Sequence, residues 1–138
     1  MDYYAVLAAA TEAEVCAVAA DALGRAPVGE VRLLSGPETG MVMLRVRESV
    51  ADSQFNAGEV LVTQVHLESD GQVGFAVVLG DAPRRAIAVA LIDALLRSGG
   101  EQADALTAAL SDLRALTQER RRTMNRLIAR TAVDFETF

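Results

Sequence analysis

The chain has a single imidazole, that of His66. It alternates with Gln64 and Glu68 along an extended run, which indicates a strand face that is at least partly wet. One histidine without a cysteine cluster cannot define a metal site. We therefore expect a solvent-facing side chain and keep a general base as the alternative.

The segment where a loop enters a strand, residues 55–63, holds four more candidates. Thr63 shares its strand face with three aliphatic residues, so we expect its hydroxyl to be buried and bonded to the backbone. Glu59 suits either a subunit boundary or plain exposure to solvent. Phe55 and Gly58 suit an apolar plug and a bend, or contact with a ligand. None of the four has a visible catalytic partner.

Two arginines and one aspartate complete the set. Arg45 and Arg47 point the same way from one strand and could hold a triphosphate or a phosphonate through bidentate hydrogen bonds. Solvated charges at a sheet edge are the commoner use of such residues. Asp93 stands four residues before Arg97 on a predicted helix, so an i,i+4 ion pair, or a contact with a partner subunit, explains it better than catalysis. We predict no catalytic residue and no metal site.

Composition narrows the function classes. The chain has 138 residues, enough for one domain with a core of its own. Its 13 cationic residues are all arginine, and without lysine there is neither a Walker-type phosphate lysine nor a Schiff base. The net charge of −6 argues against non-specific nucleic-acid binding, which needs a basic surface.

Membrane and secretory signals are not expected. Charges interrupt the apolar stretches well before the roughly 18 residues that a membrane span needs. The opening residues carry no basic region ahead of an apolar core, and the single Cys16 excludes an internal disulfide. These features together predict a cytoplasmic protein.

The hydrophobic periodicity predicts helices first, strands next and helices last. Residues 3–23 are rich in alanine, and Thr11 with Glu14 forms the pattern of a capping box. A period of two then marks strands at 30–33, 42–47, 60–67 and 73–79, with turn residues at 36–40 and a hairpin signal at Asp70-Gly71. In the last of these strands Val73, Phe75, Val77 and Leu79 share one face. A helix over 83–97, buried on two sides, and a longer one after Gly100 complete the chain.

We therefore predict an α+β fold in the order α-α-β-β-β-β-α-α, a four-stranded antiparallel meander with N-terminal helices and two C-terminal helices, the last one long. Residues 1–138 form a single domain, in which 101–138 is a helical arm that projects or docks on another chain. An apolar tail would support docking of this arm, and it comprises Val133, Phe135 and Phe138. The open sheet face would carry Met43, Arg45, Val62 and His66 and be available to a partner.

Three segments carry a resemblance to a known family. Residues 37–42 (PETGMV), 55–63 (FNAGEVLVT) and 91–95 (LIDAL), in this order and spacing, resemble the PhnG family, a subunit family of the carbon–phosphorus lyase core complex. Val133-Asp134-Phe135 is similar to the family's short C-terminal motif, although Glu136 replaces an aromatic residue there.

The resemblance implies an accessory subunit in organic phosphonate catabolism. Its partners would be PhnH, PhnI and PhnJ. The complex would transfer the ribose triphosphate of ATP to an alkylphosphonate, as an alpha-D-ribose 1-methylphosphonate 5-triphosphate synthase. The chain would then belong to a transferase without being catalytic alone and without a cofactor of its own.

Two other functions stay open on the sequence. One is an independent small-molecule enzyme that uses His66 or Glu59. The other is a homo-oligomeric module that binds a small molecule without catalysis and self-associates through its sheet face when expressed alone. The size of the chain alone and with its candidate partners would separate these from an accessory subunit.

Overall fold

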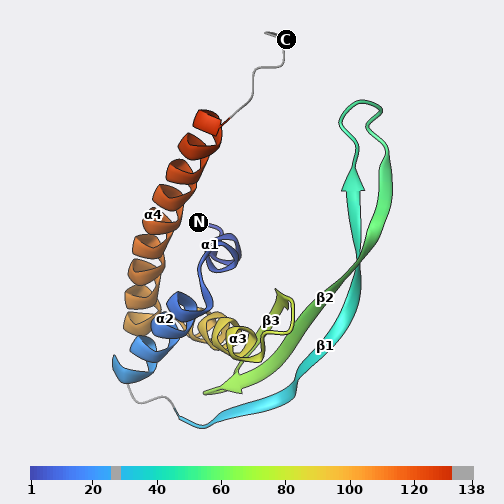
Figure 1. Ribbon diagram of the computed structural model, residues 1–138. Coiled ribbons are helices and arrows are strands. Elements are labelled where there is room, and N and C mark those ends of the chain that lie inside the picture. Colours follow the sequence, from blue (N-terminus) through green and yellow to red (C-terminus); the bar gives the residue numbers. More distant parts are fainter. Residues whose placement is uncertain (26–28, 132–138) are drawn as a thin grey trace, which may run out of the picture.

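A computed structural model of the chain describes residues 1–25 and 29–131. Within these residues the fold is α+β, and a single antiparallel sheet has the order β1-β2-β3. Figure 1 shows the helices gathered beside one end of this sheet. The elements are α1 (Tyr3–Ala9), α2 (Glu12–Arg25), β1 (Val31–Arg47), β2 (Gln54–Ser69), β3 (Gln72–Leu79), α3 (Pro83–Ser98) and α4 (Gly100–Thr131).

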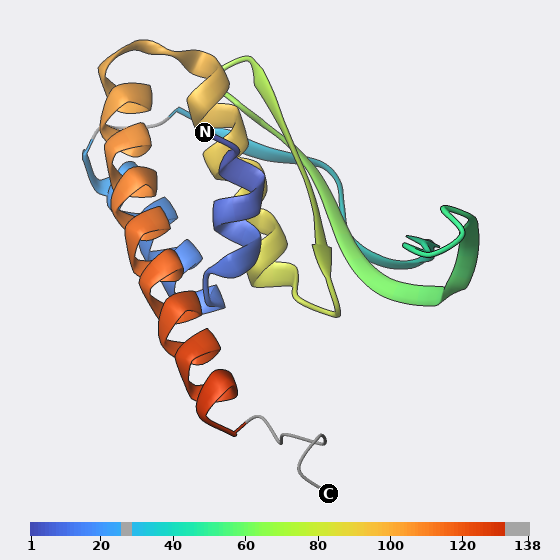
Figure 2. The same cartoon turned by 90° about the horizontal axis from the view of Figure 1, so that it is seen from above.

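Helix α3 is the centre of the fold. It begins with Pro83, whose missing N–H costs nothing in a first turn, and it is followed by Gly99 at φ 72°. Nearly every residue from Ala86 to Leu95 is buried, because β2 and β3 cover one side of α3 while α2 and α4 cover the other (Figure 2). The prediction that this helix is buried on two sides is confirmed.

Small residues on β3 let α3 approach the sheet closely. Gly74 and Ala76 face the helix, and both are buried. A Cβ atom at Gly74 would collide with the carbonyl oxygen of Ala90 and would lie 2.9 Å from the Cβ atom of Ala94. The face of β3 that packs on α3 is therefore the one with the least side-chain volume.

The larger residues of β3 consequently lie on the open face of the sheet. They share one face, as predicted, but no element of the described chain covers that face, and they stay between 39% and 75% exposed. These residues are Val73, Phe75, Val77 and Leu79.

The prediction of four strands is wrong, because Val31–Arg47 form one strand instead of two. The expected turn at 36–40 lies within β1, where register shifts between Leu33 and Ser35 and between Ser35 and Glu38 absorb Gly36 and Pro37. The edge position of β1 tolerates a proline that cannot donate to a ladder. The order of elements is thus α-α-β-β-β-α-α over residues 1–25 and 29–131. The hairpin at Asp70-Gly71, between β2 and β3, is confirmed.

The β1–β2 hairpin extends well beyond the helices. Its turn is closed by a 2.8 Å hydrogen bond from the N–H of Glu48 to the carbonyl of Ser53. Because β3 pairs only with residues 62–69 of β2, the part that we call the distal hairpin, residues 41–61, has two strands and no third. Figure 1 shows it extending beyond the helices, with the concave side of the bent ribbon towards them.

Four residues were expected on an open sheet face, and three of them are exposed. Met43, Arg45 and His66 face solvent, whereas Val62 is buried. Helix α4 also extends past the body, since residues 118–131 are all exposed. The predicted tail residues Val133, Phe135 and Phe138 lie outside the described residues.

The capping box at the start of α2 links that helix to α4. Thr11 and Glu14 exchange the two predicted hydrogen bonds, of 2.9 and 3.2 Å, and Glu14 also pairs with Arg120 of α4 at 2.8 Å. The Arg120 guanidinium first, and then the N–H of Thr11, lower the pKa of Glu14 from 4.5 to about 2. This carboxylate therefore stabilises the fold above pH 4.5, and the contribution is lost as the pH falls towards 2.

Replacing Glu14 by Gln should flatten the acid limb of the stability curve. Between pH 4.5 and 2 the wild-type chain should lose stability more steeply than Glu14→Gln, as measured by urea unfolding followed by circular dichroism. Glu12→Gln, two residues earlier on the same helix, is the control. Parallel acid limbs for wild type and Glu14→Gln would contradict the role given to this pair.

Substitution of Gly74 tests the close approach of α3. Gly74→Ala should destabilise the chain by about 1–3 kcal/mol, because the backbone of α3 cannot move aside as a flexible side chain would. Gly40→Ala on β1, where a Cβ atom meets nothing within 4 Å, should stay within about 0.5 kcal/mol of wild type. Equal urea midpoints for the two variants would refute the packing argument.

Candidate functional site

Five of the predicted site residues lie on the distal hairpin: Arg45, Arg47, Phe55, Gly58 and Glu59. Arg45 and Phe55 come together at a shallow hollow of about 250 Å³ that Gln54 and Asn56 also line. Arg47 pairs instead with Asp52 in the turn at 3.3 Å, and both side chains are exposed. The structure therefore does not hold the two arginines together around one anion.

Gly58 and Glu59 follow an irregularity of the hairpin. Gly58 has φ 136° and pairs with Leu44, next to a register shift, so this position requires glycine for its backbone. Glu59 pairs across the ladder with Met43 and is exposed. Gly58 therefore lies at an irregular point of the ladder, and Glu59 stands on a surface that nothing in the described chain covers.

His66 lies on the open face of the sheet, where its ring packs on Phe75 with centroids 4.4 Å apart. Glu59 is seven residues away along the same strand, roughly 23 Å at 3.3 Å per residue. Side chains at that separation cannot act on one reacting atom. The geometry therefore gives no support to a catalytic pair made of His66 and Glu59.

Thr63 is buried, and its hydroxyl is hydrogen-bonded to the backbone both as a donor and as an acceptor, as expected. Its hydroxyl donates to the carbonyl of Gly80 at 2.6 Å and accepts from the N–H of Ala82 at 3.0 Å. These bonds fix the loop that leads from β3 into α3. The role that the structure shows for Thr63 is thus to position α3 against β2.

Asp93, which is itself buried, is the centre of a polar cluster between α1, α3 and β3. Its carboxylate accepts from the hydroxyl of Tyr4 at 2.6 Å, from the backbone N–H of Phe75 at 3.0 Å and from Nε of Arg97 at 3.2 Å. The predicted i,i+4 pair with Arg97 is therefore present. Since the bond to Phe75 caps a donor of an edge strand, Asp93 also closes part of that edge.

The contacts in this cluster shift the pKa values of Tyr4 and Arg97. Burial first, and then the hydrogen bond and the negative charge of Asp93, raise the pKa of Tyr4 above 10.0. The same carboxylate raises the pKa of Arg97. Two hollows of about 220 and 280 Å³ flank Tyr4, the first lined mainly by apolar side chains of α1 and α3. Neither hollow holds a nucleophile paired with a base.

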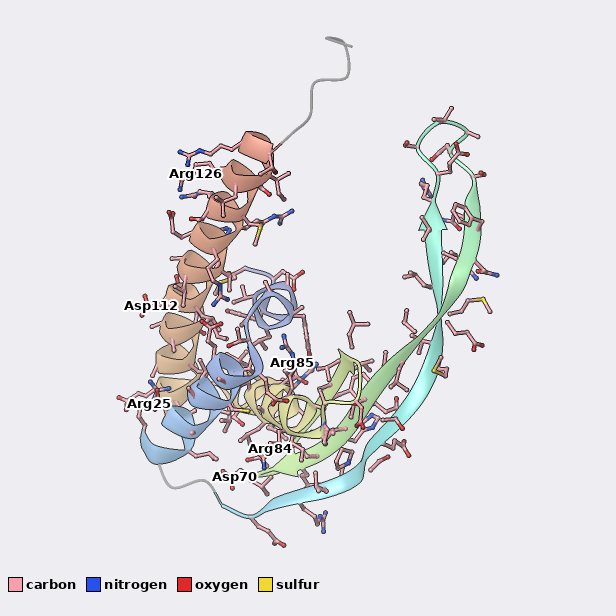
Figure 3. The ribbon with its side chains drawn as sticks, viewed as in Figure 1. Arg25, Asp70, Arg84, Arg85, Asp112 and Arg126 are labelled. Atoms are coloured by element: carbon pink, nitrogen blue, oxygen red, sulfur yellow. The ribbon has the colours of Figure 1, made fainter. Side chains whose placement is uncertain are left out.

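Arg85 is a structural residue that sequence reasoning missed. It reaches from α3 to the C-terminal end of α1 and donates to the carbonyls of Leu7, Ala8 and Ala10 at 2.6–3.0 Å (Figure 3). A cation at this end of a helix satisfies its orphan carbonyls and opposes its dipole. The sequence signal was the position of Arg85 in the first turn of a buried helix, where a charge needs a partner.

No group of three or more potential metal ligands occurs in residues 1–25 and 29–131. The helices of the same residues include none with the length and hydrophobicity of a membrane span. The described chain does present large apolar side chains that are exposed to solvent. We use the name apolar surface for nine of them. It comprises Met41, Val42, Met43, Leu44, Phe55, Val73, Phe75, Val77 and Leu79.

The apolar surface is the candidate functional site. It covers both strands of the distal hairpin and the open face of β3, and large exposed apolar side chains gathered on these elements mark a surface that can bind another protein. Its chemistry suits the burial of another protein's side chains and not the binding of a charged metabolite.

Comparison with known proteins agrees with the resemblance seen in the sequence. A family model described as phosphonate metabolism protein PhnG matches residues 1–138. The alpha-D-ribose 1-methylphosphonate 5-triphosphate synthase subunit PhnG of Rhizobium meliloti (strain 1021) is 38% identical over 99 residues. That alignment covers 71% of this chain and 62% of the relative, so the chain matches less than two thirds of the relative's length.

Removal of the Tyr4 hydroxyl tests the Asp93 cluster. Tyr4→Phe should lower the free energy of unfolding by about 0.5–1.5 kcal/mol at pH 7. The figure is that of a hydrogen bond to a charged group, reduced because Tyr4 is partly exposed to solvent. The raised pKa of Tyr4 also makes the stability of the fold depend on pH. The protonated hydroxyl stabilises the fold below pH 10, and this contribution is lost as the pH rises through the pKa of Tyr4 in the folded chain. Urea midpoints from pH 7 to 11 should fall more steeply for wild type than for Tyr4→Phe.

Tyr3→Phe, one residue earlier on α1, controls for the loss of a phenol. Identical alkaline limbs in wild type and Tyr4→Phe would show that the bond to Asp93 contributes nothing to folding.

Proposed function

This chain belongs to the PhnG family of phosphonate metabolism proteins, and we propose that it is an accessory subunit of the carbon–phosphorus lyase core complex. Its relative is named a subunit of alpha-D-ribose 1-methylphosphonate 5-triphosphate synthase, which supports a place in a multi-subunit enzyme. The proposed partners are PhnH, PhnI and PhnJ.

The reaction of the proposed complex joins ATP to an alkylphosphonate. A phosphonate oxygen forms a bond to C1 of the ribose as the bond from C1 to adenine breaks. With methylphosphonate the products are alpha-D-ribose 1-methylphosphonate 5-triphosphate and adenine. In this proposal other subunits supply the reacting groups, and the present chain completes the assembly that holds them.

One observation carries the proposal, namely the apolar surface of the distal hairpin. A two-stranded ribbon is marginally stable in water on its own. Here the ribbon exposes Met41, Val42, Met43 and Leu44 in succession, so apolar side chains face solvent on both of its sides. Such a segment gains stability when neighbouring polypeptides cover it.

The arrangement of polar residues agrees with an accessory role. Asp93, Thr63 and Arg85 each make two or more long-range hydrogen bonds, and all of these bonds secure contacts within the fold. The remaining candidates of the described chain are dispersed along β1 and β2 without forming a catalytic pair. A subunit whose partners supply the reacting groups needs no catalytic pair of its own.

Reconstitution tests the proposal. PhnH, PhnI and PhnJ are purified together with and without this chain and supplied with ATP and methylphosphonate. The chain should co-elute with them on size exclusion, and adenine should be released only when it is present. A chain that stays separate from the three proteins, or an adenine release that does not depend on it, would reject the proposal. Turnover by the chain alone would favour an independent enzyme, and a stable homo-oligomer would favour the binding module.

Polar substitutions on the distal hairpin should weaken that assembly without unfolding the chain. Met43→Gln with Leu44→Gln removes two side chains that are about half exposed in the free chain, so its urea midpoint should hardly change. Binding to PhnH, PhnI and PhnJ should weaken by about 1–3 kcal/mol per buried side chain, at least about tenfold in the dissociation constant.

Val50→Gln is the matched control. Val50 is also an exposed aliphatic residue, at 91%, but it lies in the turn between β1 and β2. It should bind as wild type does. Equal affinity for the Met43/Leu44 variant and the control would show that the distal hairpin is not the interface.

A further inference from the structure

The packing seam of α4 continues beyond the part of the helix that the body covers. Five residues at alternating spacings of three and four face the body and are buried: Ala103, Leu106, Leu110, Leu113 and Thr117. The same alternation next reaches Arg120, Met124 and Leu127. Such a 3-4 repeat keeps one stripe of a helix facing the same side, as in coiled-coil packing.

The last ion pair between α4 and the body is that of Arg120, whose guanidinium meets Glu14 at 2.8 Å, and Arg121 still lines a hollow beside α1. We call residues 118–131 the distal α4 arm, and all of them are exposed. The stripe within it is apolar, because Met124, Leu127 and Ile128 lie three and four residues apart and are each at least half exposed. An interface that begins inside the chain thus runs on without a partner in the described residues.

The distal α4 arm differs in charge from the rest of the chain. It carries five arginines and one glutamate, a net charge of +4, whereas the whole chain has a net charge of −6. By the helical period, Arg121 and Arg130 flank the apolar stripe on its two sides. Glu119 pairs with Arg122 and Arg126 at 3.4 Å, so it offsets one charge of the outer face and none of the flanks.

We infer that the distal α4 arm is a second docking element, whose occupant is a helix of another subunit with an apolar stripe bordered by aspartate or glutamate. The 3-4 spacing of the arm specifies a helical occupant, and its flanking arginines specify carboxylates. This inference rests on the proposed function, because the occupant belongs to the same assembly.

A second copy of the chain fits the arm less well than such a subunit. Symmetric pairing of two distal α4 arms would place Arg121 and Arg130 of each against the like charges of the other. The arm also cannot pair with the first half of α4 in a second copy, because the packing seam there is already buried against the other helices of that copy. A lipid surface is also disfavoured, since the three large apolar side chains of the distal α4 arm form only a narrow apolar face.

Two pairs of substitutions test the arm in the full chain. Leu127→Gln with Ile128→Gln removes apolar contact from exposed positions and should weaken binding to purified PhnH–PhnI–PhnJ about tenfold or more. Arg121→Glu with Arg130→Glu should weaken binding by a similar factor at low salt and should reduce the salt dependence of the dissociation constant.

A matched control changes the same charge elsewhere. Arg25→Glu with Arg84→Glu alters two exposed arginines at the base of the body, far from Arg126 of the arm (Figure 3). This pair should bind as wild type does, and circular dichroism should show all variants folded. Binding to anionic vesicles of phosphatidylglycerol tests for a membrane contact. The size of the chain alone in solution tests for self-association.

The outcomes separate this inference from the proposed function. If wild type binds PhnH–PhnI–PhnJ and both arm variants bind equally well, the inference fails while the subunit role stands. If wild type does not bind at all, both fail. Vesicle binding or dimerisation that the arm variants abolish, with assembly unchanged, would assign the arm to a membrane or to a second copy and overturn the inference.

Discussion

The close contact between α3 and the small-residue face of β3 is the constraint on which the rest of the structure depends. Gly74 and Ala76 admit the backbone of α3 at a distance that larger side chains would forbid. Asp93, Thr63 and Arg85 then tie α3 to β3, to β2 and to α1. Because the helices cover that one face and only one end of the sheet, the open face of β3 and the distal hairpin stay uncovered.

This division explains how a chain with a real core can still depend on neighbours. The buried side chains around α3 form the core of the body, whereas the distal hairpin and the distal α4 arm have no core of their own. The two arms differ in chemistry, since one is apolar on both sides and the other is a basic helix with an apolar stripe. In the proposed complex they would contact surfaces of different character.

Periodicity predicted most of the elements and the face that the β3 residues share, but it could not tell which face is covered. Val73 and Phe75 look like a core stripe because they are apolar and alternate, yet Gly74 between them faces the helix. The extra strand arose because Gly36 and Pro37 usually mark a turn, whereas β2 is long enough to pair on both sides of them. The capping box and the Asp93–Arg97 pair were predictable because both are local. The bonds from Arg85 to α1 and from Asp93 to Tyr4 join residues between 75 and 89 positions apart, which spacing rules do not reach.

Hydrogen exchange of residues 41–61 tests the central claim most directly. The amides of this ribbon should exchange quickly in the free chain, where only two strands protect them, and should slow by orders of magnitude in the complex with PhnH, PhnI and PhnJ. Amides of α3, buried in both states, provide the internal reference. Protection of residues 41–61 that is the same in the free chain and in the complex would contradict the account.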